Sequence, residues 1–193
     1  MELYEAIEKR RTIRVMKEKA SEEQLKRILL AGTKAPSAGN RQPWEFIVID
    51  DQEITEQLAE LKYQLSLGLS FREGESQEEI EARARHQKKS FDQASVVAVC
   101  TPSGQSPSAW LCIENMSLAA VDEGLGSGIV TYWGNEKKRA EKILKLPNDY
   151  QLVAVVRIGE PGEEGLPREM NPVCPRRPEF SWVHKNTFVQ KTV

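Results

Sequence analysis

The stretch Ala35-Pro36-Ser37-Ala38-Gly39-Asn40-Arg41-Gln42-Pro43-Trp44 is the most informative part of this sequence. Its two prolines restrict the backbone, and its short polar side chains supply hydrogen-bond donors and acceptors. The apolar run 44–49 follows directly, which predicts a rigid loop that leads into a strand buried on both faces. We expect Trp44 to pack in the core and the loop to help hold a ligand.

A second stretch, Lys9-Arg10-Arg11-Thr12-Ile13-Arg14, is a compact cluster of cations. Guanidinium groups can bind phosphate oxygens through two parallel hydrogen bonds, and Thr12 adds a hydroxyl. Three arginines alone would be explained as a solvated surface run. The second basic pair, Arg176-Arg177, lies in a tail without helical periodicity and favours a binding role instead. The two stretches together predict a site for a flat, anionic ligand that bears a phosphate.

Size and composition predict one globular domain over residues 1–193. The chain has a mass of 21.9 kDa, with 39% hydrophobic and 29% charged residues. Its 29 acidic and 27 basic residues give a net charge of −2, so a nucleic-acid partner is not expected. No apolar run approaches the ~20 residues that span a bilayer, and the first residues lack the pattern of a signal peptide. We therefore expect a cytoplasmic protein without a membrane partner.

The cysteines and histidines do not indicate a catalytic or metal site. The spacing of Cys100, Cys112 and Cys174 fits neither a disulfide framework nor a zinc site. The two histidines, His86 and His184, lie in polar surroundings and are interpreted as surface residues. We therefore expect no metal and no catalytic side chain.

Apolar periodicity and turn residues outline the secondary structure. A capping box of Ser21 and Gln24 predicts a helix start. The glycine cluster 124–128 is interpreted as a helix cap and a tight turn, because it precedes a strand instead of joining a strand to a helix. The pattern predicts helices over 2–10, from Ser21, over 54–65 and over 106–124, and a charged helix that carries Ile143 and Leu144. It predicts strands over 44–49, 96–100, 129–133 and 152–159.

Three segments indicate contacts beyond an ordinary core. The helix 106–124 has apolar residues on two faces, which predicts burial in the centre of the protein or against a partner. The polar, densely charged segment 68–89 is interpreted as mobile helices or a lid over the site. Residues 162–193 are rich in proline and basic residues, and we expect them to form an extended C-terminal arm.

These motifs resemble, in order along the whole chain, those of the flavin-dependent nitroreductases. The run 10–14 is similar to the signature that opens the family, and 35–44 resembles its Ala-Pro-Ser…Asn-x-Gln-Pro-Trp loop. Residues 114–126 look like its central dimer helix, and 158–161 look like its last strand. The resemblance implies an α+β nitroreductase-like fold, with a central mixed or antiparallel sheet flanked by helices. It also implies an intertwined homodimer with a C-terminal arm.

The resemblance also implies that FMN binds at the dimer interface. In that arrangement Arg10, Thr12 and Arg176 hold the phosphate, and Arg11 contributes through its backbone. Arg14 lies near the N1/O2 edge of the isoalloxazine ring, where a cation stabilises the charge of the reduced flavin. The remaining predicted contacts are Pro36, Ser37 and Asn40 from the partner subunit, and the backbone of Ile129, Val130 and Thr131 near flavin N5.

The function implied is an FMN-dependent oxidoreductase with a ping-pong mechanism. NADH or NADPH would deliver a hydride to flavin N5, and a nitroaromatic, a quinone or a related electrophile would then be reduced. One alternative is a reductive dehalogenase of the iodotyrosine deiodinase type, for which Glu60, Lys62 and Tyr63 are candidates with poorly matching spacing. The other is a flavin-binding module without turnover, since bulky Tyr132 and Trp133 follow the N5 segment.

Overall fold

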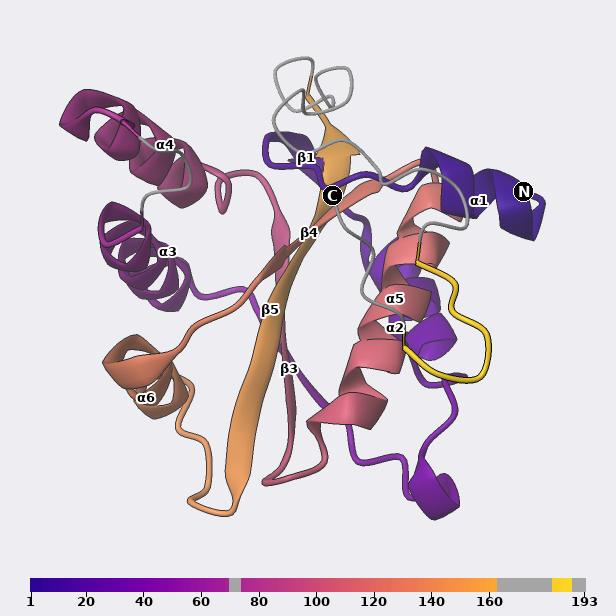
Figure 1. Cartoon of the computed structure of the whole chain (residues 1–193). Coiled ribbons are helices and arrows are strands. Elements are labelled where there is room, and N and C mark those ends of the chain that lie inside the picture. Colours follow the sequence, from indigo (N-terminus) through magenta and orange to yellow (C-terminus); the bar gives the residue numbers. More distant parts are fainter. Residues whose placement is uncertain (70–73, 163–181, 189–193) are drawn as a thin grey trace.

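One antiparallel sheet with helices on both faces forms the centre of the molecule (Figure 1). The computed structural model describes residues 1–69, 74–162 and 182–188. In these residues the sheet has five strands, in the order β1-β5-β3-β2, and β4 also pairs with β5. The strands are β1 (Met16–Lys19), β2 (Glu45–Ile49), β3 (Ser95–Pro102), β4 (Gly126–Val130) and β5 (Tyr150–Pro161). The expected α+β fold with a central antiparallel sheet is confirmed.

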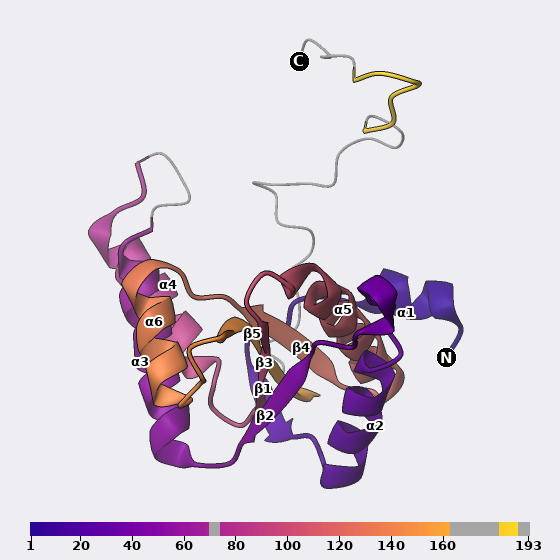
Figure 2. The same ribbon diagram turned by 90° about the horizontal axis from the view of Figure 1, so that it is seen from below.

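Each face of the sheet carries its own helical layer (Figures 1 and 2). The helices are α1 (Leu3–Lys9), α2 (Glu22–Gly32), α3 (Gln52–Leu67), α4 (Gln77–Lys89), α5 (Ser106–Asp122) and α6 (Gly134–Ile143), with a 3-10 turn at Ala38–Asn40. The α2–α5 pair packs on one face, and the α3–α4 pair with α6 packs on the other. The buried residues accordingly form two hydrophobic clusters, one on each side of the sheet.

Helix caps follow the local sequence. The predicted capping box is confirmed, because the Gln24 backbone N–H donates to Ser21 Oγ at 3.3 Å and the Ser21 N–H donates to Gln24 Oε1 at 3.1 Å.

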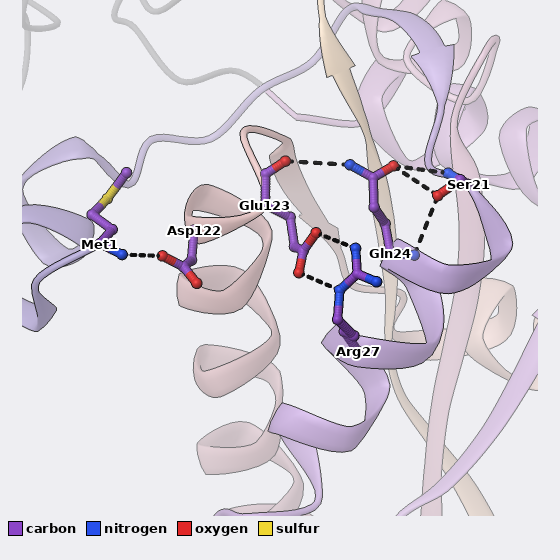
Figure 3. Close-up of polar contacts among 6 residues, drawn as sticks. All are labelled: Met1, Ser21, Gln24, Arg27, Asp122 and Glu123. Atoms are coloured by element: carbon purple, nitrogen blue, oxygen red, sulfur yellow. Dashed lines mark hydrogen bonds and ion pairs between the residues drawn. The ribbon is translucent and has the colours of Figure 1, made fainter.

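Ion pairs and hydrogen bonds connect α2 to the end of α5 (Figure 3). The Arg27 guanidinium donates two bonds to the Glu123 carboxylate, at 2.6 and 2.7 Å. The same view shows the N-terminal ammonium of Met1 paired with Asp122 at 2.7 Å.

The polar segment 68–89 includes a regular helix, α4, whose side chains are paired with α3. Lys88 bridges Glu56 at 2.7 Å and Glu60 at 2.9 Å, and Ala84 is fully buried against the neighbouring elements. Its start is a second capping box, in which Glu79 N–H donates to Ser76 Oγ at 3.2 Å. The expectation of helix is thus confirmed here, and a role as a lid stays a prediction.

Two strand predictions were wrong in detail. The run 44–49 was expected to be buried on both faces, but β2 pairs only with β3 among the described strands, and Val48 is 40% exposed. β2 lies at an edge of the sheet, and only Ile49 of its five residues is fully buried. The strand expected at 129–133 begins earlier, at Gly126, and ends at Val130. The glycines 126 and 128 are therefore strand residues, and only Gly124 takes the left-handed turn, with φ 75°.

The remaining expectations concern burial and the C-terminal arm. Trp44 is 6% exposed and packs in the α2–α5 cluster, as predicted. Cys100 and Cys112 are buried free thiols, whereas Cys174 lies outside the described residues. Most of the predicted arm 162–193, with Arg176, also lies outside them. Within the described part of the chain, none of the helices has the length and apolar character needed to cross a membrane.

Candidate functional site

The cationic stretch 10–14 is held against the edge of β4. The backbone N–H of Ile13 donates to the carbonyl of Ser127 at 2.9 Å, and Thr12 forms a parallel bridge with Ser127. Ile13 is 5% exposed, while Thr12 and Arg14 are exposed. Successive side chains of an extended segment point to opposite sides, so burial of Ile13 turns Thr12 and Arg14 outward. The fold therefore presents the predicted hydroxyl and guanidinium on one accessible face.

The three arginines of this stretch differ in their partners. Arg10 Nε lies 3.6 Å from a carboxylate oxygen of Glu114 on α5, which is beyond hydrogen-bond distance. Arg11 turns back and donates to the carbonyls of Glu8 and Arg10, at 2.5 and 2.8 Å. Arg14 forms no ion pair or hydrogen bond with any residue that the structure describes. Arg10 and Arg14 are thus available to a ligand, and the side chain of Arg11 is occupied.

The loop 35–44 has internal hydrogen bonds, but it lies away from the cationic stretch 10–14 of the same chain. Ser37 Oγ accepts a hydrogen bond from the Gln42 N–H at 2.9 Å, and the Asn40 carbonyl accepts one from Gln42 Nε2 at 3.3 Å. Asn40 has a left-handed backbone with φ 54°, and Pro36 and Asn40 are exposed. The 3-10 turn of this loop and the region between α1 and β1 lie at opposite ends of the molecule (Figure 1). A single chain therefore separates the two halves of the predicted site.

The residues after β4 alternate between surface and core. Ile129 is 37% exposed, Val130 is buried and Thr131 is partly buried. Tyr132 points into the α3 layer, where its hydroxyl donates to the carbonyl of Leu58 at 2.8 Å. Trp133 is 43% exposed. The ring of Tyr132 is thus a core element, and Trp133 is the bulky side chain that remains at the surface.

A buried arginine crosses beneath this strand. Arg157 of β5 is directly opposite Gly128 of β4 and is 1% exposed. Its Nη1 donates to the carbonyl of Ser90 at 2.8 Å, its guanidinium lies 5.3 Å from the ring centroid of Phe91, and its Nε has no hydrogen-bond partner. Burial, followed by the charge of Arg14, lowers the pKa of Arg157 to about 10. This charge was not singled out in the sequence, although it interrupts an otherwise apolar strand.

Lys62 adds a further cation on the α3 side. Its Nζ lies 5.4 Å from the ring centroid of Trp133. Burial lowers the pKa of Lys62, and the charges of Arg157, Arg83 and Arg14 lower that pKa further. Lys62 therefore carries its charge in a partly buried position on α3, beside an aromatic ring.

The proposed dehalogenase candidates are not gathered into one group. Glu60 accepts from Lys88 at 2.9 Å and from Gln64 at 3.3 Å, and the bond from Lys88 is the main cause that lowers its pKa. Residues two positions apart on a helix point to different sides, so Glu60 faces α4 while Lys62 faces Trp133. Two hollows on the surface beside α2 are not lined by any of the predicted FMN contacts. No cluster of potential metal ligands is found among the described residues.

Comparison with known proteins decides the family. Residues 7–160 match the model of the nitroreductase family. The chain belongs to the nitroreductase family. The order of motifs expected from the sequence and the antiparallel sheet with two helical layers are both accounted for by this membership.

Relatives within the family carry different activities in their names. A putative NADH dehydrogenase/NAD(P)H nitroreductase from Archaeoglobus fulgidus is 30% identical, over 84% of this chain and 87% of that protein. An iodotyrosine deiodinase from Thermotoga neapolitana is 27% identical, over 83% of this chain and 89% of that protein. The solved structure of an oxidised iodotyrosine deiodinase bound to FMN and 3-iodo-L-tyrosine has a TM-score of 0.76 and 26% identity, covering 97% of this chain and all of that one. The family membership supports an oxidoreductase.

Proposed function

We propose that this nitroreductase-family chain is an FMN-dependent oxidoreductase that takes a hydride from NADH or NADPH and reduces a small electrophile, such as a nitroaromatic or a quinone. The observation that carries the proposal is the stretch 10–14, held on the edge of β4 by the Ile13–Ser127 bond with Thr12 and Arg14 facing outward. An FMN-bound deiodinase of the same fold supports the choice of cofactor.

The donor set at this edge fits FMN. A phosphate needs hydrogen-bond donors and positive charge, and Arg10 with the hydroxyl of Thr12 supplies both. No carboxylate among the described residues pairs with Arg14, so its charge is available to an electron-rich ring edge. The left-handed backbone at Asn40 and the bond from Gln42 to Ser37 keep the 36–40 loop in a fixed shape for a second contact.

When bound, FMN supplies the redox chemistry by accepting two electrons and passing them to the acceptor. The residues of the chain bind and orient the cofactor. Arg10, Thr12 and Arg176 would hold the phosphate, with Arg11 contributing its backbone. Arg14 would stabilise the negative charge that develops on the N1/O2 edge of the ring. The backbone of Ile129, Val130 and Thr131 would contact the flavin near N5, and no side chain would be required as an acid or a base.

A second copy of the chain completes the site in this proposal. In one chain, the loop with Pro36, Ser37 and Asn40 lies far from the 10–14 stretch (Figure 1). Several large apolar side chains of α1 and α5 are exposed, which is unfavourable unless another surface covers them. They are Leu3 at 62%, Tyr4 at 82%, Ile7 at 46%, Trp110 at 41% and Leu111 at 49%. The exposure of Trp110 and Leu111 supports a partner-facing side on the helix 106–124.

Anaerobic stopped-flow spectroscopy of the purified protein tests the proposal. We expect bound FMN, its bleaching by NADH or NADPH, and its reoxidation by a nitroaromatic or a quinone in a separate step. Parallel lines in double-reciprocal plots are expected for the ping-pong order. Protein that fails to bind added FMN would overturn the proposal. FMN that binds but is never reduced would favour the alternative of a binding module.

Reductive dehalogenation is a second candidate, because a deiodinase structure bound to 3-iodo-L-tyrosine has the same fold. Titration of the oxidised holoenzyme with 3-iodotyrosine tests it through the flavin absorbance and fluorescence. The pairing of Glu60 with Lys88 argues against a carboxylate clamp at Glu60. We therefore expect no spectral change, and saturable perturbation would favour the dehalogenase.

A further inference from the structure

We propose that the buried guanidinium of Arg157 makes bound FMN easier to reduce, because it places a fixed positive charge behind the surface formed by the stretch 10–14 and β4. The inference rests on the proposed function and adds a residue that acts on the cofactor without touching it. Arg157 lies on β5, directly opposite Gly128 of β4. Gly128 immediately precedes the segment 129–131 that the proposed function assigns to flavin N5.

The charge of Arg157 is buried and has no counter-ion among the described residues. Its side chain is 1% exposed, in a run that is otherwise apolar from Leu152 to Ile158. Its Nη1 donates to the carbonyl of Ser90 at 2.8 Å, and the ring centroid of Phe91 lies 5.3 Å from the guanidinium. Its Nε has no hydrogen-bond partner, and none of the described carboxylates forms an ion pair with it. The positive charge therefore acts on its surroundings without being neutralised.

A role in stability does not explain a buried charge of this kind. Removing an ion from water carries a large penalty, which the two neutral partners of Arg157 offset only in part. An apolar side chain of similar length would fill the same space without that penalty. The position of the charge is therefore the property to explain.

The guanidinium lies behind the cationic stretch. A side chain at Gly128 would collide with both the Arg157 guanidinium and the backbone carbonyl of Ile13, so both groups pack against the same residue of β4. Ile13 is buried, while its neighbours Thr12 and Arg14 are exposed. The charge of Arg14 also lowers the pKa of Arg157, which requires the two cations to be near each other. A ligand bound against Arg14 is thus within the field of the buried charge.

Reduction changes the charge of the flavin. A hydride brings two electrons and one proton, so the ring gains one negative charge when NADH or NADPH reduces it. A fixed positive charge stabilises this form more than the neutral oxidised ring. The field of a buried group passes through a medium less polar than water and is little screened by salt. The pKa of Arg157, about 10, keeps its guanidinium charged at neutral pH.

The midpoint potential of the bound FMN tests the inference, measured by anaerobic equilibration with a reference dye. Arg157→Met removes the charge and keeps an unbranched side chain. We expect about a tenfold shift of the equilibrium toward oxidised FMN, on the scale of one charge acting through a medium of effective dielectric constant about 20. For a two-electron couple this shift is a decrease of about 30 mV. Arg157→Lys keeps the charge and should retain most of the wild-type potential.

Arg139→Met is the control, because it makes the same change in net charge at an exposed position of α6. Its midpoint potential should equal that of wild type. Urea unfolding of the apoproteins separates a structural role from an electrostatic one, since Arg157→Met should be at least as stable as wild type. If that variant does not fold, the potential is measured in Arg157→Gln, whose amide is polar but uncharged, and the same decrease is expected.

An unchanged potential in the folded Arg157→Met or Arg157→Gln protein would overturn the inference alone. An equal decrease in Arg157→Lys and Arg157→Met would also overturn it, because the effect would then follow from the shape of the side chain instead of its charge. A wild-type protein that binds no FMN would overturn the proposed function as well.

Discussion

Arg157 fills the space that a side chain at Gly128 would need. The two residues face each other across β4 and β5, and a Cβ added at Gly128 would lie 2.6 Å from Arg157 Nη2 and 2.5 Å from the carbonyl oxygen of Ile13. The absence of a side chain at Gly128 therefore allows two close contacts with β4. The buried guanidinium passes beneath β4, and the cationic stretch 10–14 lies close against its edge.

Gly128→Ala should destabilise the fold and weaken FMN binding. One of the two clashing groups is backbone, which cannot rotate away, so the stretch at Ile13 must shift. Overpacking of this kind costs about 1–3 kcal/mol, and we expect a loss of that size in the free energy of unfolding in urea. Fluorescence titration with FMN should show weaker binding of the same variant, because Arg10 and Arg14 move with Ile13.

Gly68→Ala is the matched control. Gly68 has an ordinary φ of −79° at the end of α3, and the nearest atom to an added Cβ there is the Leu65 carbonyl oxygen, at 3.7 Å. Stability should be unchanged or higher by about 0.4–1 kcal/mol, since alanine restricts the unfolded chain. Equal stability of the Gly128 and Gly68 variants would contradict the packing argument.

Arg10→Ala should weaken FMN binding without unfolding the protein. The side chain is partly exposed, and its approach to Glu114 at 3.6 Å is too long to contribute much to stability. Loss of a charged hydrogen bond to phosphate costs about 1.5–3 kcal/mol, which is roughly 10–150-fold in the dissociation constant. Isothermal titration calorimetry of the apoprotein with FMN measures this dissociation constant.

Arg27→Ala is the control for this variant. It removes the surface pair with Glu123 (Figure 3) and should leave the affinity for FMN unchanged. A Kd for Arg10→Ala equal to that of wild type would show that Arg10 does not touch the phosphate.

Local signals in the sequence predicted the elements that depend on local interactions. The capping box at Ser21 forms from residues three positions apart, and the buried face of α5 follows from helical spacing. The phosphate-binding role of the stretch 10–14 also rests on residue types alone, and it stays a prediction. These features need no knowledge of long-range pairing.

Features that depend on register across the sheet could not be predicted. β1 has the charged sequence Met-Lys-Glu-Lys and exists because it pairs with the end of β5. The run 44–49 does not reveal that its strand has a single neighbour. The burial of Arg157 follows from a glycine opposite it, and this pairing is visible only in the folded chain. The partly buried position of Lys62 over Trp133 has the same origin.

Two buried thiols should make the protein less stable at alkaline pH. Burial raises the pKa of Cys100 and of Cys112 from 9 to about 12. Between these values the unfolded chain releases the thiol protons and the folded chain keeps them, so the free energy of unfolding falls as pH rises. From pH 8 to pH 10 we expect a loss of roughly 1 kcal/mol per thiol.

Urea unfolding of wild type and of Cys112→Ala at both pH values isolates this effect. The variant removes one titrating thiol, so its loss of stability between pH 8 and pH 10 should be smaller than that of wild type by roughly 1 kcal/mol. The lowered pKa of Lys62 acts in the opposite direction but is present in both proteins, and it cancels in the comparison. An identical pH dependence in the two proteins would show that Cys112 ionises as freely as an exposed thiol.

If the proposed dimer forms, Leu111→Glu should convert it into monomers and reduce FMN binding. Leu111 lies on α5 and is 49% exposed, whereas Ile113 and Met116 of the same helix are buried in the chain's own core. A carboxylate on the exposed face leaves the fold of one chain intact but cannot be buried against a second copy. Light scattering should therefore show a smaller particle, and FMN affinity should fall because the contacts from Ser37 and Asn40 of the partner subunit would be lost.

Leu30→Glu, at a 52% exposed position on α2, is the control and should remain dimeric with FMN bound. A wild-type monomer that binds FMN as tightly as the proposed dimer would show that one chain forms the site by itself.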